Sequence, residues 1–76
     1  MKKIERNKKC KFSQRVKQLR QEFNMSQQDL ASVFGCDRAT ICKWEVMGKE
    51  PCYETLIEIA NYFGVTCDYL LGASDF

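Results

Sequence analysis

A chain of 76 residues has room for one domain, because so short a chain buries only about 60% of the surface that it exposes when unfolded. Hydrophobic residues make up 45% of the chain and charged residues 29%, which excludes a largely disordered protein, and no apolar run approaches the roughly 18 residues of a membrane span. The net charge is +2, but residues 1–20 hold nine basic residues and one acidic residue, whereas residues 51–76 hold four acidic residues and no basic one. We expect a cytoplasmic protein with one end facing a polyanion; a solvated basic tail is the alternative.

The N-terminal segment has two parts. Residues 1–11 have no sustained periodicity and few apolar groups, which predicts a flexible basic arm. Apolar residues then recur at three- and four-residue spacing as far as Phe23, which predicts an amphipathic helix that begins near Ser13. Asn24 tolerates left-handed geometry and is predicted to end this helix.

The next segment carries strong signals for helix ends. Ser26 is a good N-cap, and Asp29 three residues later completes a pattern like a capping box. Gly35 can supply a left-handed turn at the end of this second helix, and Asp37 is the next N-cap. The connection is therefore only about three residues long, which forces the second and third helices to cross at a steep angle.

Three more helices follow. The pattern predicts a third helix over residues 38–47 that Gly48 ends, and a fourth over residues 53–63. Thr66 is predicted to open a short fifth helix, which Gly72 closes. No segment alternates in the way that a half-buried strand would, so the sequence predicts an all-α fold of five helices.

The cysteines do not form a recognisable framework. Their number is odd, no pair has C-x-x-C spacing, and the chain has no histidine to complete a common zinc site. We therefore expect no metal and five reduced thiols, with a redox switch at Cys36 or Cys42 as the alternative. The five are Cys10, Cys36, Cys42, Cys52 and Cys67.

The third predicted helix has two contrasting faces. At about 100° per residue, Ile41 and Trp44 fall on one side, where we expect them in the core. Arg38 stands at the N-terminal tip, and a small and basic set occupies the outer side. A helix of this kind is suited to lie in a groove, although a solvated face is an equally good interpretation of this helix alone. The outer set is Ala39, Cys42, Lys43 and Val46.

The whole region resembles a known family. The segment QQDLASVFGCDRATICKWE resembles the helix-turn-helix of the phage-repressor and Cro family, the XRE-like transcriptional regulators. The flanking segments RVKQLRQEFNMSQ and EPCYETLIEIANYFGVTCDYLLG resemble the first and last helices of its DNA-binding domain. The resemblance covers residues 12–72 and implies a compact five-helix, lambda-repressor-like domain, followed by a tail over residues 73–76.

The resemblance also implies roles for particular residues. Gln27 would contact the DNA backbone and brace the first reading residue, while Thr40 and Lys49 would add phosphate contacts. Two positions depart from the family pattern: Met47 stands where the family usually has glycine, with Gly48 following it, and Cys42 is an unusual base-facing residue. The implied base-facing residues are Arg38, Ala39, Cys42 and Lys43, and the implied partly buried ion pair joins Arg20 and Glu45.

These implications favour one function over two others. The resemblance implies a sequence-specific regulator that binds double-stranded DNA through its third helix in the major groove, as a homodimeric repressor on a palindromic operator. The alternative is a protein-binding module of the antitoxin or antirepressor type on the same scaffold. An enzyme is the third and least favoured class, because the chain has no catalytic motif. We also expect no cofactor, no membrane partner and no small-molecule ligand. The dimer surface is expected in the acidic C-terminal third, which holds Tyr53, Tyr62, Tyr69 and Phe76; the alternative is that the tyrosines cap the core.

Overall fold

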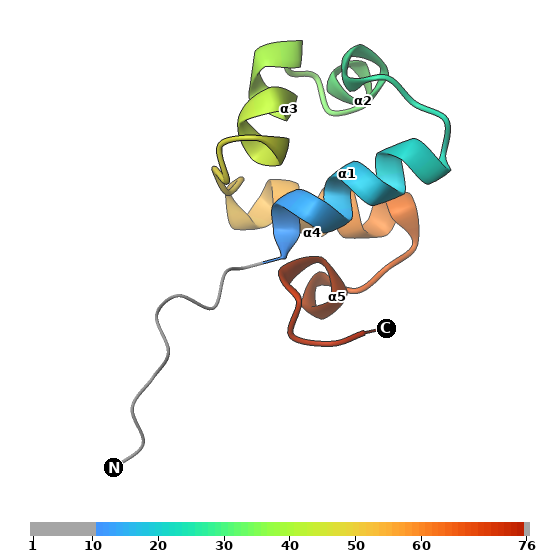
Figure 1. The fold of residues 1–76 in the computed structure, drawn as a ribbon, viewed down its shortest axis with the longest axis vertical. Helices are drawn as coiled ribbons and strands as arrows, with labels where there is room; N and C mark the ends of the chain where they lie inside the picture. Colours follow the sequence, from blue (N-terminus) through green and yellow to red (C-terminus); the bar gives the residue numbers. More distant parts are fainter. Residues whose placement is uncertain (1–10, 76) are drawn as a thin grey trace.

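In the computed structural model, which describes residues 11–75, five α-helices follow one another and no strand occurs within this range. The helices are α1 (Phe12–Glu22), α2 (Gln27–Val33), α3 (Arg38–Glu45), α4 (Tyr53–Phe63) and α5 (Cys67–Leu71). Figure 1 shows α1 lying across α4, with α2 and α3 on one side of this pair and α5 on the other. The predicted all-α fold of five helices is confirmed. The prediction of a flexible arm falls, apart from Lys11, outside the described residues, as does Phe76.

No helix among the described residues is long and apolar enough to span a bilayer.

Two helix boundaries differ slightly from the prediction. Helix α1 begins at Phe12, one residue early, because Lys11 serves as its N-cap and its backbone N–H donates to the Leu71 carbonyl at 3.4 Å. Helix α3 ends at Glu45, two residues before the predicted Met47. The Met47 N–H still donates to the Lys43 carbonyl at 3.2 Å, so the helical hydrogen bonding continues through the predicted range.

The short turn between α2 and α3 sets the relative direction of these helices. Gly35 has φ +66°, and the N–H of Cys36 donates to the Ala31 carbonyl at 3.0 Å, as in a Schellman motif. Asp37 then caps α3 by accepting from the Thr40 backbone N–H at 2.9 Å. Hydrogen bonds from Thr40 lower the pKa of Asp37 below its ordinary value, so this cap is present at neutral pH and weakens as the pH falls through the lowered pKa.

The core is built around Trp44, which is 4% exposed. Its ring centroid lies 6.1 Å from that of Phe12 and 6.4 Å from that of Phe34. The prediction that Trp44 is a core residue is confirmed. Phe23 continues the apolar stripe of α1, yet it is exposed and contacts Phe63 edge-on, because α1 ends just beyond the core. The buried residues are Phe12, Val16, Leu19, Leu30, Ala31, Ile41, Trp44, Leu56, Ile59, Ala60, Phe63 and Leu70.

Arg15 fastens the C-terminal segment to α1. Its Nη1 donates to the carbonyls of Tyr69 at 2.7 Å and Ser74 at 2.8 Å, and its guanidinium carbon lies 4.1 Å from the centre of the Tyr69 ring. Asp75 adds an ion pair at 3.4 Å, but its side chain is largely exposed. Arg15 therefore stabilises the fold, although it belongs to the basic segment, residues 1–20, that the sequence analysis expects to face a polyanion.

Replacing Arg15 by alanine should lower the free energy of unfolding by about 2 kcal/mol, since two charge-assisted hydrogen bonds and a cation–π contact are lost together. Urea denaturation followed by circular dichroism measures this loss. Lys17→Ala is the matched control, because Lys17 is an exposed cation on the same helix. Equal stability of the two variants would contradict the structural role of Arg15.

Candidate nucleic-acid interface

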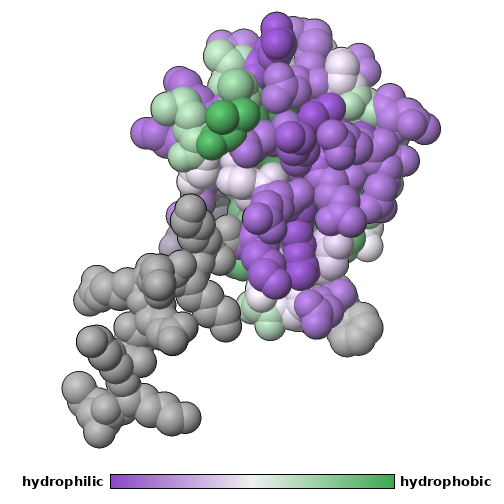
Figure 2. All heavy atoms as spheres, in the orientation of Figure 1, coloured by the Kyte–Doolittle hydropathy of each residue, from purple (hydrophilic) through white to green (hydrophobic). Residues whose placement is uncertain are grey.

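The outer face of α3 is the surface on which the candidate residues gather. Ile41 and Trp44 are buried beneath it, whereas Arg38, Ala39 and Lys43 are exposed. Cys42 is half-buried beside them. In Figure 2, hydrophobic atoms gather over α3 and the loop that follows it, and most of the remaining face is hydrophilic. Because Ile41 and Trp44 are buried while Arg38, Ala39 and Lys43 are exposed, α3 has the two contrasting faces that the sequence predicts.

An ion pair whose side chains are largely shielded from water joins α1 to α3. The Nε atom of Arg20 donates to Glu45 Oε2 at 2.7 Å, and its Nη2 donates to Glu45 Oε1 at 3.1 Å. The side chains are 12% and 1% exposed, respectively. Arg20 also donates from Nη1 to the Met25 carbonyl at 2.7 Å. The pair that the resemblance implies thus joins α1, α3 and the turn before α2.

Gln27 links the ion pair to the exposed face. Its Nε2 donates to Glu45 Oε1 at 3.2 Å, and its Oε1 accepts from Arg38 Nε at 3.4 Å. The resemblance implies that Gln27 braces the first reading residue, and the structure places the two side chains in contact. The bond from Gln27 to Glu45 was missed by sequence reasoning, because residues 18 positions apart give no periodic signal.

Thr40 and Lys49, the two residues for which the resemblance implies phosphate contacts, differ in whether their side chains are already engaged within the protein. The Thr40 hydroxyl donates to Asp37 Oδ1 at 2.7 Å, so its proton is directed at the cap of α3 and not outward. Lys49 is exposed, and its backbone N–H donates to the Lys43 carbonyl at 3.1 Å. Gly48, with φ +69°, permits this wide turn after Met47. The sequence signal for the bond from Thr40 to Asp37 was the three-residue spacing of a capping side chain.

The described cysteines are not in disulfides. Cys36, Cys42 and Cys67 are half-buried, and Cys52 is exposed. Burial raises the pKa of the Cys36 thiol, which disfavours the reactive thiolate there. Hydrogen bonding to Thr55 lowers the pKa of Cys52, which stands at the N-cap position of α4. Cys10 lies outside the described residues, and within residues 11–75 no group of three or more Cys, Asp or Glu side chains is placed to hold a metal ion.

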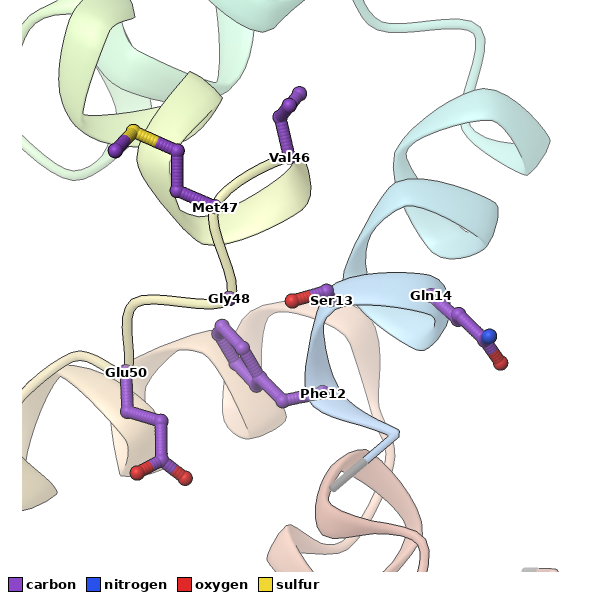
Figure 3. Close-up of a pocket in the computed structure, with 7 residues that line it drawn as sticks. All are labelled: Phe12, Ser13, Gln14, Val46, Met47, Gly48 and Glu50. Atoms are coloured by element: carbon purple, nitrogen blue, oxygen red, sulfur yellow. The ribbon is translucent and has the colours of Figure 1, made fainter. Parts of the chain in front are cut away.

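A groove of about 510 Å³ lies beside the C-terminal end of α3. The groove separates the start of α1 from the loop after α3. In Figure 3 the Phe12 ring lies beneath Gly48, while the Val46 and Met47 side chains extend away from that ring. Glu50 is the charged residue at its wall. A negative side chain disfavours a phosphate, so this groove is not part of the candidate interface.

Comparisons with known proteins agree on one type of domain. A family model described as helix-turn-helix matches residues 16–70. The chain is 38% identical over 60 residues to the uncharacterized HTH-type transcriptional regulator YqaE of Bacillus subtilis, covering 79% of this chain and 52% of the relative. It is 36% identical over 64 residues to the HTH-type transcriptional activator BcrR of Enterococcus faecalis, covering 84% and 31% of the two chains. The chain spans about half the length, or less, of these curated relatives.

A solved structure has the same fold. The P22 c2 repressor protein, in complex with the synthetic operator 9T, superposes with a TM-score of 0.75 and 25% sequence identity. The match covers 83% of this chain and 96% of the repressor chain. The arrangement of five helices is therefore that of a phage-repressor DNA-binding domain.

Proposed function

Since the chain belongs to the helix-turn-helix family, we propose that it is a sequence-specific regulator of transcription that binds double-stranded DNA. One observation carries the proposal: α3 presents Arg38, Ala39 and Lys43 outward above the buried Ile41 and Trp44. Basic and small side chains on a rigidly anchored helix are the combination that major-groove reading requires. A regulator of this kind would act in the cytoplasm.

In the proposed complex, α3 lies in the major groove. Arg38 can give two parallel hydrogen bonds to a guanine edge, and Lys43 one turn later can bond a base or a phosphate. Ala39 lets the helix approach closely, and Cys42 can contact a thymine methyl group. Lys49 adds a phosphate contact from the loop. Thr40 can donate to a phosphate only if its hydroxyl gives up the hydrogen bond to Asp37, so we consider Lys49 the better phosphate contact.

We further propose that the protein represses transcription as a homodimer on a palindromic operator, with half-sites separated by about 34 Å. A single small domain makes few base contacts, and a symmetric dimer on two half-sites makes twice as many. Tyr53 is the best candidate for the dimer surface, since its side chain is 85% exposed beside a groove of about 200 Å³. Tyr69 lies under Arg15 and Tyr62 contacts Phe63, so these two residues instead cap the core.

The Arg38→Ala variant tests the reading role of α3. It should relax the preference at one base pair of each half-site by about 1–3 kcal/mol, because a bidentate contact to guanine is lost. Binding selection from a random pool of duplexes, run in parallel for the original protein and the variant, measures the change. Lys17→Ala serves as the control for lost positive charge. A uniform loss of affinity across all sequences would make Arg38 a phosphate contact instead.

A further inference from the structure

We infer that Glu45 is a positioning residue for sequence recognition: it fixes the orientation of the Gln27 amide and, through that amide, the placement of Arg38. The inference rests on the proposed function, because Arg38 is taken to read a base. It goes further in assigning part of the specificity to a side chain that is 1% exposed and cannot reach DNA itself.

The first step is the chemistry of the Glu45 carboxylate. Within the described residues, the two oxygens accept hydrogen bonds from three donor atoms: Arg20 Nε, Arg20 Nη2 and Gln27 Nε2. An ionised carboxylate accepts hydrogen bonds and donates none. The end of the Gln27 side chain that faces Glu45 must therefore be the NH₂ group, and the carbonyl end must point the other way.

The second step concerns the outward end of the amide. Because Nε2 faces Glu45, Oε1 of Gln27 faces α3 and accepts from Arg38 Nε at 3.4 Å. A flipped amide would present NH₂ to the guanidinium, and two donors cannot bond each other. The carboxylate behind Gln27 thus selects the one amide orientation that can hold Arg38.

The third step is the consequence for Arg38. With Nε–H bonded to Gln27, the N–H groups on its two Nη atoms remain available to pair with two acceptors on a guanine edge. Restricting the side chain before binding reduces the ordering cost of the complex. Arg20 holds the far side of the network, since it bonds both Glu45 and the Met25 carbonyl just before α2.

The test is Glu45→Gln, which removes the charge but keeps the shape, so that the amide of Gln27 is no longer forced into one orientation. Binding selection should show the preference at the base pair assigned to Arg38 relaxed by about threefold or more, with the other base pairs unchanged. In an Arg38→Ala background the same substitution should cause no further relaxation there. Glu54→Gln, an exposed acid on α4, controls for the change in net charge.

Three outcomes distinguish the alternatives. Equal weakening at all base pairs, or the same relaxation with and without Arg38, would overturn the positioning role and leave Glu45 a purely architectural residue. Circular dichroism at the binding temperature checks the fold; if Glu45→Gln is unfolded, Glu45→Asp keeps the charge, withdraws the carboxylate from Gln27 and carries the same expectation. Absence of any sequence preference in the original protein would instead overturn the proposed function, and the positioning role with it.

Discussion

Glu45→Ala is expected to lower the free energy of unfolding by about 3–5 kcal/mol. The Glu45 carboxylate accepts two hydrogen bonds from Arg20, and both side chains are largely shielded from water. Removing the carboxylate leaves the Arg20 guanidinium with the Met25 carbonyl as its one remaining partner within residues 11–75. The loss therefore includes the cost of an uncompensated buried charge, which exceeds what forming the pair contributes.

Urea denaturation of Glu45→Ala, Arg20→Ala and the double variant Arg20→Met/Glu45→Leu measures this cost. The single variants should both be strongly destabilised, while the double variant should be much closer to the original protein, because apolar side chains of similar volume replace the pair. Glu58→Ala, which removes an exposed acid on α4, is the control. A loss below about 1 kcal/mol for Glu45→Ala would mean that the pair behaves like an exposed one.

Trp44→Ala is expected to lower the free energy of unfolding by about 3–5 kcal/mol, because it leaves a cavity at the centre of the core. The indole contacts the rings of both Phe12 and Phe34 and thereby ties α3 to α1 and to the end of α2. A domain of this size has a total stability of the same order, so the variant should be largely unfolded at 37 °C.

Thermal denaturation of Trp44→Ala, followed by far-ultraviolet circular dichroism, tests this expectation. Ile57→Ala is the control, since it removes a large apolar side chain from a position on α4 that is 52% exposed and should change stability by less than about 1 kcal/mol. A folded Trp44→Ala variant that has lost only DNA binding would contradict the core role and identify the indole as a contact to DNA.

The helix ends could be predicted from sequence because their signals are local. Ser26 and Asp29 form the capping box that their spacing predicts, and Asn24 and Gly35 have the left-handed dihedral angles that their side chains permit. The end of α3 was harder to predict. Met47 lies where a glycine would stop the helix, so the chain continues to Gly48 and closes a wider turn.

Contacts between distant segments could not be predicted from the pattern of residue types. Arg15 has the same charge as the other basic residues within residues 1–20, yet it bonds carbonyl groups more than 50 residues away. The face of α3 was predictable, because periodicity alone separates Ile41 and Trp44 from the outer residues. The bond from Gln27 to Glu45 depends on how α2 packs against α3, and this geometry follows from the three-dimensional fold.

Binding selection from a random pool of DNA duplexes, carried out at two salt concentrations, tests the central claim most directly. The account predicts enrichment of a dyad-symmetric motif with half-sites about one helical turn apart, and an affinity that falls steeply as the salt concentration rises. Weak, salt-sensitive retention without any enriched sequence would contradict it. That result would indicate a protein-binding module on the same scaffold, with another protein as its ligand.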